Sequence, residues 1–252
     1  MFKKKIQNEP EDRKYILQKE SSFLMREAYT TLRTNILFSL PAGGCKVIAV
    51  TSAHRSEGKS TNCVNMAISF GQLGAKVLII DCDLRRPNVN RLMEEKADTG
   101  LSNLLIGLCD FGEAVRKTKY ENLDAIYAGE IPPNPTELLC SERMIVLMEA
   151  LSKGYDYIFI DTPPVCVVSD AAILSKFVSG IVFVVKSGQT DRKAVADAVH
   201  HLEFSKTKIL GYVLANLPIK GGKYGRYGRY KRNGYYLDEN YGYYGHERQS
   251  TE

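Results

Sequence analysis

A loop that could hold phosphate groups spans residues 51–61, between an apolar run at residues 47–51 and a segment with a helical pattern. Its sequence, TSAHRSEGKST, follows the pattern G-x-x-x-x-G-K-[ST], with Ala53 at the position of the first glycine. In such a loop, backbone N–H groups and a helix N-terminus cradle phosphates, the lysine reaches the outer phosphates, and the hydroxyl binds Mg²⁺. The residues expected to bind a nucleotide are Glu57, Gly58, Lys59, Ser60 and Thr61, with Ser60 also on the metal.

Three carboxylates follow apolar runs and strengthen this interpretation. Asp81 and Asp83 stand at the end of the run at 77–81, and Asp161 ends the run at 157–161. Ligands of an open parallel sheet bind at the carboxyl ends of its strands, so these groups and the loop should meet at one edge. A helix cap is the alternative for any one carboxylate, and a surface turn is the alternative for the Gly-Lys-Ser triplet. Together, however, the groups supply the metal ligands and the acceptor-orienting carboxylate that phosphoryl transfer requires.

The elements that must position these residues can be read from the hydrophobic pattern. Short runs rich in branched apolar residues occur at 47–51, 77–81, 157–161, 180–185 and 209–215, as expected of strands buried on both faces. Helical patterns lie at 22–39 and 190–204, and the other gaps between the runs are long enough for helices. Strands that alternate with helices predict an α/β fold, a doubly wound and mostly parallel sheet flanked by helices, as in P-loop NTPases.

Composition excludes several other classes. The 252 residues are 44% hydrophobic and 25% charged, which is typical of a folded globular protein. No apolar run approaches the roughly 18 residues of a membrane helix, and no apolar stretch follows the basic start as it would in a secretory signal. Six dispersed cysteines without a C-x-x-C pair, and four histidines, indicate neither a zinc site nor a disulfide framework. We therefore expect a cytoplasmic protein.

The composition changes abruptly after Leu217. Eight of the fifteen tyrosines lie in this last stretch, among glycines and basic residues, and six basic residues but no acidic one lie between Lys220 and Arg232. So few aliphatic residues cannot form a core, which predicts a flexible tail. Its basic part is expected to be drawn to the edge that carries Asp81, Asp83 and Asp161.

Five motifs in order resemble those of the bacterial tyrosine kinases of capsule and exopolysaccharide synthesis. They are Ser-Glu-Gly-Lys-Ser-Thr at 56–61, Asp-x-Asp-Leu-Arg-Arg-Pro at 81–87, the run from Gly129 to Leu139, Asp-Thr-Pro-Pro at 161–164, and the terminal tyrosine cluster. In that family the first, second and fourth motifs are Walker A, Walker A′ and Walker B. The resemblance implies a flexible arm at 1–21, a P-loop kinase domain at 22–218 and a tyrosine-rich flexible tail at 219–252.

The resemblance also implies an activity and its cofactors. It implies an enzyme, a non-specific protein-tyrosine kinase that uses ATP and Mg²⁺ and phosphorylates its own tail. The expected catalytic residues are Lys59, on the β and γ phosphates; Asp83 and Asp161, which with Ser60 reach the metal; and Asp81, which takes the tyrosine proton. From the sequence alone, Asp81 and Asp83 could exchange roles. The expected phosphorylation sites are Tyr224, Tyr227, Tyr230, Tyr235, Tyr236, Tyr241, Tyr243 and Tyr244.

Partners are implied in the same way. In the Gram-positive type, a cytoplasmic kinase without a membrane segment is activated by a separate membrane protein, which recruits it to the inner face of the cell membrane. The resemblance further implies a cognate tyrosine phosphatase, other protein substrates in polysaccharide synthesis, and a homo-oligomer formed as a ring. We expect transfer in trans within that oligomer.

Two departures from the family pattern bear on these expectations. The family usually has Pro-Gly where this chain has Arg55-Ser56, so the backbone angles of the loop could differ. The helical motif for ring assembly, Glu-x-x-Arg-x-x-Arg, has Thr30 in place of its first arginine, between Glu27 and Arg33. The motif therefore does not decide whether a ring forms.

Two other functions remain as alternatives, and one residue has two interpretations. A partition-type or division-site ATPase would share the fold and the acidic motifs, but its signature lysine is replaced here by His54. A single-stranded nucleic-acid binder would use the basic tyrosine-rich tail, although the main domain has no basic aromatic module and no nucleic acid is expected. Asn216 could contact adenine, or it could simply form a strand-end turn before Pro218.

Overall fold

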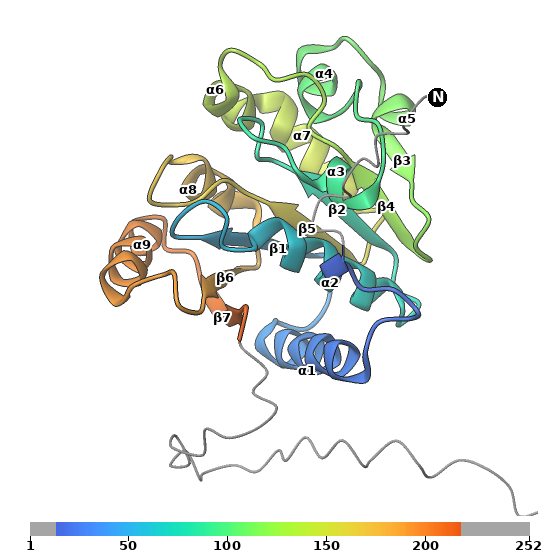
Figure 1. The fold of residues 1–252 in the computed structure, drawn as a ribbon. Coiled ribbons are helices and arrows are strands. Elements are labelled where there is room, and N and C mark those ends of the chain that lie inside the picture. Colours follow the sequence, from blue (N-terminus) through green and yellow to red (C-terminus); the bar gives the residue numbers. More distant parts are fainter. Residues whose placement is uncertain (1–13, 218–252) are drawn as a thin grey trace, which may run out of the picture. The chain divides into compact units, whose positions relative to one another are not determined.

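The computed structural model describes residues 14–217, which form an α/β fold around one seven-stranded sheet (Figure 1). The strand order is β3-β4-β2-β5-β1-β6-β7, and all neighbouring strands are parallel except β3 and β4. The strands are β1 (Lys46–Ser52), β2 (Val77–Asp81), β3 (Val115–Lys117), β4 (Leu123–Ile126), β5 (Tyr157–Asp161), β6 (Gly180–Lys186) and β7 (Ile209–Ala215). The predicted fold class and all five predicted strands are confirmed, but β7 lies at the edge of the sheet and is not buried on both faces as predicted.

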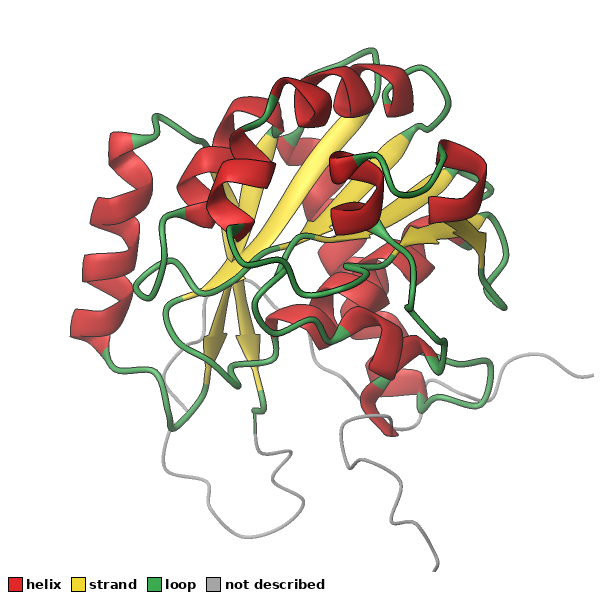
Figure 2. Cartoon of the chain, turned by 90° about the horizontal axis from the view of Figure 1, so that it is seen from above, coloured by secondary structure: helices red, strands yellow, loops and turns green. Residues whose placement is uncertain are grey.

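Helices cover both faces of this sheet, as the doubly wound prediction requires (Figure 2). On one face the core contains side chains of α1 (Phe23–Ser39), α2 (Lys59–Gly71) and α3 (Val89–Met93). The other face is covered by α4 (Leu101–Ile106), α6 (Pro135–Cys140), α7 (Glu142–Leu151), α8 (Asp170–Leu174) and α9 (Arg192–Phe204). The remaining short elements are α5 (Phe111–Ala114) and the 3-10 turn η2 (Ser175–Phe177). None of the helices within residues 14–217 is long and apolar enough to cross a membrane.

The phosphate loop and the acidic residues are positioned by the central strands. Strands β2, β5 and β1 lie side by side, with Asp81 in register with Asp161 and Val50 in register with Asp161 on the other side. The loop that leaves β1 leads directly into α2, whose residues are almost all buried. Because α2 is enclosed by the core, the start of this helix is a rigid support for whatever binds there.

The segment from Lys14 to Ser21 corrects the prediction of a flexible arm at 1–21. Ile16 and Leu17 are only 3% and 2% exposed and pack into the same core as α1 and α2. The Asn65 side chain in α2 holds the backbone of this segment, because it accepts from Leu17 N and donates to the carbonyl of Tyr15, both at 2.7 Å. We call residues 14–17 the strap. Two apolar residues in a polar segment are enough to dock it.

The other parts of the predicted arm and tail lie outside the described residues. These are residues 1–13 and 218–252, which include all eight predicted phosphorylation sites. The eight sites are Tyr224, Tyr227, Tyr230, Tyr235, Tyr236, Tyr241, Tyr243 and Tyr244.

Asn65→Ala is expected to loosen the strap and destabilise the domain by about 1–3 kcal/mol, because it leaves buried backbone groups without their partners. Urea unfolding measures the change, and Asn35→Ala on the exposed face of α1 is the control, expected to stay within about 0.5 kcal/mol. Equal stabilities of the two variants would show that the Asn65 contacts are not what holds the strap.

Candidate functional site

A cavity of about 990 Å³ opens beside the start of α2. It is lined by the loop from Arg55 to Asn62, the loop that follows β2, residues 163–168 and the end of β7. Side chains of α1 and Tyr15 of the strap close another part of its wall. The predicted phosphate loop therefore lines a cavity large enough for a nucleotide.

The phosphate loop has a left-handed backbone at two positions, Ser56 and Gly58. Gly58 caps α2 with a left-handed backbone (φ +92°), and Ala53 is fully buried at the first glycine position. Ser56, which stands where the family usually has glycine, also has a positive φ of 61°. The Lys186 ammonium at the end of β6 donates to the Ser56 carbonyl at 2.9 Å. The departure from Pro-Gly thus leaves Ser56 in a left-handed conformation of the kind that glycine adopts readily.

Glu57 supports the loop from inside. Its side chain is 1% exposed and accepts hydrogen bonds from His54 N at 2.9 Å and from Thr190 Oγ1 at 2.6 Å. Both carboxylate oxygens are therefore engaged within the protein, and any contact of Glu57 with a nucleotide is left to its backbone. Thr190, just before α9, is a supporting residue that the motif search missed because it lies far from the loop in sequence.

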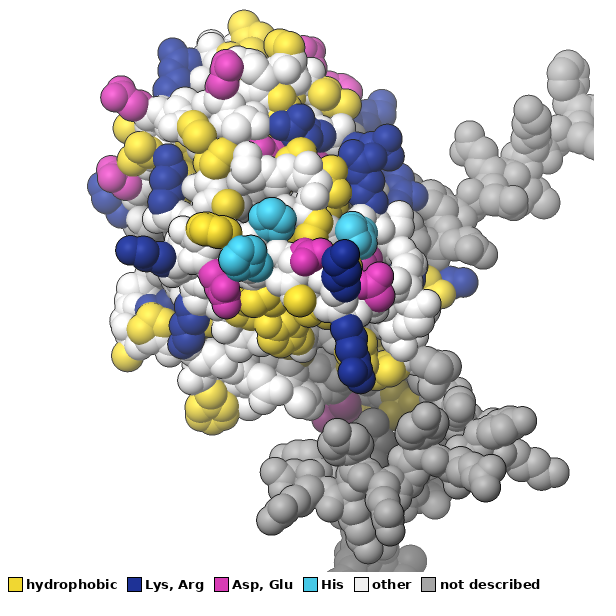
Figure 3. Space-filling model, turned by 90° about the vertical axis from the view of Figure 1, so that its left-hand side faces the viewer, with side chains coloured by type: hydrophobic (Ala, Val, Ile, Leu, Met, Phe, Trp, Pro, Cys, Tyr) yellow, Lys and Arg dark blue, Asp and Glu magenta, His cyan; other side chains and the backbone are white. Residues whose placement is uncertain are grey.

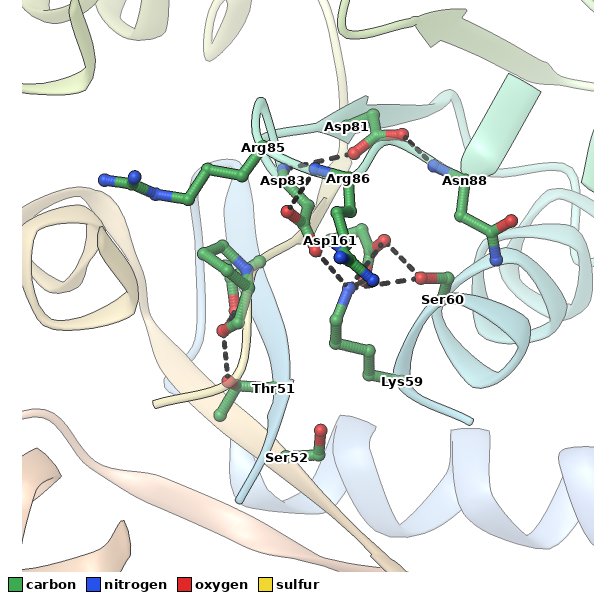
Figure 4. Close-up of polar contacts among 12 residues, drawn as sticks. Thr51, Ser52, Lys59, Ser60, Asp81, Asp83, Arg85, Arg86, Asn88 and Asp161 are labelled. Atoms are coloured by element: carbon green, nitrogen blue, oxygen red, sulfur yellow. Dashed lines mark hydrogen bonds and ion pairs between the residues drawn. The ribbon is translucent and has the colours of Figure 1, made fainter. Parts of the chain in front are cut away.

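Lys59, Ser60, Asp83 and Asp161 come together at the base of the cavity (Figure 4). The Lys59 ammonium lies 2.9 Å from an oxygen of Asp83 and 3.4 Å from one of Asp161. Ser60 donates its hydroxyl hydrogen to Asp161 at 2.6 Å. Burial opposes the charge of Lys59, but the Asp161 and Asp83 carboxylates outweigh it and raise the pKa of this lysine. Lys59 is therefore a permanent cation between two carboxylates.

Asp81 has a different environment from Asp83. It is completely buried, and its two oxygens accept hydrogen bonds from the backbone N–H groups of Asp83, Asn88 and Val89 at 3.0–3.1 Å. Asp83 instead lines the cavity, with one oxygen on Lys59 and the other on Arg86 N at 3.0 Å. Asp81 thus shapes the loop after β2, while Asp83 faces the space where a substrate would bind.

Stability should fall with rising pH because of Asp81. Desolvation, together with the charge of Asp161, raises the pKa of Asp81 to about 7 from an ordinary value of 3.8. Between these values the native state holds a proton that the unfolded chain has lost, so each rise in pH favours unfolding. In metal-free and nucleotide-free buffer, we expect the unfolding free energy to decrease from pH 5 to pH 8, and Asp81→Asn to flatten this decrease. The exposed Asp98→Asn is the control that should keep the slope, and an unchanged slope in Asp81→Asn would contradict the assignment.

Three residues around a buried carboxylate, Asp170, join the motifs that flank the cavity. Asp170 in α8 is fully buried and accepts from Arg85 Nε at 2.9 Å and from Thr136 Oγ1 at 2.7 Å. Arg85 also donates to Thr136 Oγ1 at 2.8 Å. These contacts tie the loop after β2 to α6 and α8. Asp170 was not predicted, because an acid at the start of a short helix reads as an ordinary cap.

A second hydrogen-bonded chain joins the phosphate loop to the strap. Asn62 in α2 donates from Nδ2 to the Gly58 carbonyl at 2.9 Å and accepts from Tyr29 Oη at 3.0 Å. Tyr29 Oη in turn accepts from Asn65 Nδ2 at 2.8 Å, and Asn65 holds the strap. We call this chain of Gly58, Asn62, Tyr29 and Asn65 the relay. No sequence motif indicated it.

The remaining predicted residues have specific positions. Thr61 lines the cavity at the start of α2. Asn216 lines it beside the end of β7, with an exposed side chain and a left-handed backbone (φ 58°), which fits both a turn and a ligand contact. Arg33 of the helical assembly motif donates to the Ser69 carbonyl and to Ser69 Oγ, so it contacts α2 of its own chain.

The surface charge of the cavity corrects the expectation of an acidic edge. Asp81 and Asp161 are fully buried, and Asp83 is 4% exposed. By contrast, Arg55, Arg85, Arg86 and Arg91 line the cavity with exposed side chains, and Lys186 is half-buried beside them. We call these five residues the basic rim. The acids lie beneath the surface, so a basic peptide approaching the cavity meets positive charge first.

Several known proteins are similar to this chain in sequence and in structure. The sequence model of a family described as an AAA domain matches residues 45–201. Tyrosine-protein kinase YwqD of Bacillus subtilis (strain 168) is 39% identical over 202 residues, which are 80% of this chain and 85% of that protein. Putative tyrosine-protein kinase CapB of Staphylococcus aureus is 35% identical over 81% of this chain and 90% of its own length. The kinase domain of the Escherichia coli tyrosine kinase ETK superimposes with a TM-score of 0.75 at 31% identity, covering 84% of this chain and 80% of that chain.

Proposed function

The chain belongs to the bacterial tyrosine kinases, and from this premise we propose that it transfers the γ-phosphoryl group of ATP to tyrosines of its own tail. Its kinase identity sets aside the partition-type ATPase and the nucleic-acid binder. The observation that carries the proposal is the convergence of Lys59, Ser60, Asp83 and Asp161 at the base of one cavity.

The phosphates would occupy the loop between Arg55 and Thr61. Backbone N–H groups at the start of α2 would donate to the phosphates, and Lys59 would exchange its ion pairs with Asp83 and Asp161 for the outer phosphates. Held in this way, the lysine stabilises the negative charge of the transferring group without further rearrangement.

The donor set beside Lys59 fits Mg²⁺. Ser60 Oγ and the Asp161 carboxylate are oxygen donors 2.6 Å apart, and Mg²⁺ prefers oxygen ligands. Among residues 14–217 there is no group of three His, Cys, Asp or Glu that could hold a metal ion, which suits a cation that binds through one or two protein ligands and substrate phosphates. When bound, Mg²⁺ would neutralise charge on the phosphate oxygens. We propose that Ser60 and Asp161 hold it.

Asp83 is the proposed acceptor of the tyrosine proton. It lines the cavity, and one of its oxygens is held only by Lys59, which phosphate binding would draw away, whereas both oxygens of the buried Asp81 are held by backbone N–H groups. In the proposed step, the tyrosine oxygen forms a bond to the γ-phosphorus, the bond from that phosphorus to the bridging oxygen breaks, ADP leaves, and the phenolic proton passes to Asp83. Of the two assignments that the sequence left open, the structure therefore favours the exchange of Asp81 and Asp83.

The biological setting is proposed from the relatives. The chain would act in capsule or exopolysaccharide synthesis, in the cytoplasm, recruited to the inner face of the membrane by a membrane activator protein, as part of a homo-oligomer. A cognate phosphatase would reverse the modification, and other proteins of polysaccharide synthesis would be further substrates. The membrane activator is expected to stabilise the productive nucleotide site.

Incubation with ATP and Mg²⁺ followed by mass spectrometry tests the proposed activity, with phosphotyrosine in residues 224–244 as the expected product. A mixing experiment then tests transfer between chains. A Lys59→Met chain with an intact tail is combined with an active chain whose tail tyrosines are all phenylalanine. Phosphotyrosine on the inactive chain supports transfer in trans, and its absence there means that transfer occurs in cis.

A further inference from the structure

The charges around the cavity differ between its surface and its base. Among the lining residues, the acids are Glu57 and Asp83, which are 1% and 4% exposed and are hydrogen-bonded within the protein. The exposed charged residues of the lining are all cationic and belong to the basic rim. A peptide that brings a tyrosine to Asp83 must pass over this rim.

The rim is assembled from separate parts of the fold. Arg55 comes from the phosphate loop, Lys186 from the end of β6, and the three other arginines from the loop after β2 and from α3. Arg85 is paired with the buried Asp170 and points away from Lys59, whereas Arg86 extends to the cavity side of the loop (Figure 4). Within residues 14–217 the Arg86 guanidinium makes no ion pair or hydrogen bond. It is thus available to an incoming group.

Charge deeper in the site cancels only part of this rim, because Asp170 pairs with Arg85 alone. Asp83 and Asp161 share the Lys59 cation, and with Asp81 they lie buried beneath the rim, farther from an approaching peptide than the exposed arginines. The surface that a peptide meets is therefore positive, and such a surface favours acidic partners and disfavours basic ones.

The tail offers both kinds of partner in one chain. Residues 223–232 read KYGRYGRYKR, in which Tyr224, Tyr227 and Tyr230 lie among basic residues. Residues 237–247 read LDENYGYYGHE, in which Tyr241, Tyr243 and Tyr244 lie among acidic residues. We call these the basic segment and the acidic segment. They match in tyrosine number and glycine spacing but differ in the sign of their charge.

We propose that the basic rim selects tyrosines flanked by acidic residues, so that the acidic segment is phosphorylated before the basic segment. This inference rests on the proposed function, because it concerns the acceptor of the same site. Each phosphate adds further negative charge next to the remaining tyrosines of the acidic segment, which strengthens their attraction to the rim. Other protein substrates of this enzyme would carry their tyrosines among acidic residues.

Peptide binding tests the selection independently of catalysis. Fluorescently labelled peptides with the sequences of the two segments, with phenylalanine in place of tyrosine, are titrated with the full chain in the presence of ADP and Mg²⁺. At low salt the acidic peptide should bind about tenfold more tightly, and the difference should shrink in high salt because the charges are exposed. Equal binding, or tighter binding of the basic peptide, would overturn the inference.

Variants locate the effect at the rim. The double variant Arg86→Gln/Arg91→Gln should lose most of the preference. Lys76→Gln/Lys153→Gln, two exposed lysines that do not line the cavity, should keep it. A preference that persists in the arginine variant would place the peptide elsewhere and overturn the inference.

A time course of autophosphorylation gives the second readout. The initial rate at Tyr241, Tyr243 and Tyr244 should exceed that at Tyr224, Tyr227 and Tyr230 by about tenfold. Exchanging the charges, with Asp238→Lys/Glu239→Lys and Arg226→Glu/Arg229→Glu, gives the two segments the same net charge and should bring their initial rates together. Absence of phosphotyrosine from every segment would refute the proposed function, whereas phosphotyrosine in the basic segment first would refute only the selection.

Discussion

A Lys59→Met chain is expected to lose autophosphorylation by at least about 10²–10³-fold, the scale seen when one group that stabilises transition-state charge is removed. Lys59 lies between Asp83 and Asp161 at the base of the cavity, where no other lysine or arginine forms an ion pair with these two carboxylates within residues 14–217. Phosphotyrosine formed per minute at saturating ATP and Mg²⁺ measures the loss.

The same substitution should also change stability, which the sequence did not indicate. Removal of the Lys59 ammonium leaves two buried carboxylates without their cation. Such an arrangement lowers the free energy of unfolding by about 3–5 kcal/mol unless the acids are protonated. We therefore expect the loss of stability in Lys59→Met to be larger at pH 8 than at pH 5, because protonation relieves it at low pH. Thermal unfolding at the two pH values measures this.

Lys76→Met is the matched control, because Lys76 is exposed just before the amino end of β2, whereas the site lies at the carboxyl ends of the strands. It should keep both activity and stability. A Lys59→Met chain that is folded at the assay temperature and still labels at the wild-type rate would refute the assignment of the phosphate loop.

Asp83→Asn is expected to reduce kcat by about 10²–10⁴-fold, the range for loss of a positioned acid or base. The amide is nearly the same size as the carboxylate but cannot take the tyrosine proton. Since Asp83 is not placed on the phosphates, nucleotide affinity should change much less than kcat. Single-turnover labelling and titration with a fluorescent ATP analogue separate the two quantities.

Asp81→Asn distinguishes the two neighbouring acids. Asp81 orders the loop after β2 through three backbone N–H groups, so its variant should show reduced stability and a flattened pH dependence. If Asp83→Asn retained activity within a few fold while Asp81→Asn lost it at unchanged stability, the proton would pass to Asp81 and the original assignment from sequence would be restored.

Much of the fold could be predicted because strands β1, β2, β5 and β6 are largely buried on both faces and therefore appear as continuous apolar runs. β7 gave the same signal although it is an edge strand with exposed Tyr212 and Leu214. The two strands that were missed, β3 and β4, lack this signal. β3 is only three residues long, and β4 contains Asp124, which is 9% exposed and paired with Lys117 Nζ and Tyr155 Oη. A buried acid inside a short strand is identifiable only when its partners are known.

The chemical groups of the site were predictable for a related reason. Gly58, Lys59 and Ser60 are adjacent in sequence, and Asp81 and Asp161 end recognisable strands, so local patterns place them at one edge. Their supporting residues come from distant segments. Glu57 is hydrogen-bonded to Thr190, and Arg85 to Thr136 and Asp170. No spacing rule in the sequence links these partners. The sign of the surface charge was mispredicted because sequence does not show which charges are buried.

The relay makes the backbone of Leu17 a reporter of events at the phosphate loop. Its amide hydrogen is bonded to Asn65, which shares Tyr29 with Asn62 and, through it, the Gly58 carbonyl. Thermodynamic reciprocity requires that a ligand which binds more tightly when this chain of bonds is intact must raise the free energy of opening the strap by the same amount. The protection of this one amide from exchange with deuterated solvent could then report nucleotide occupancy without a chemical label on the protein.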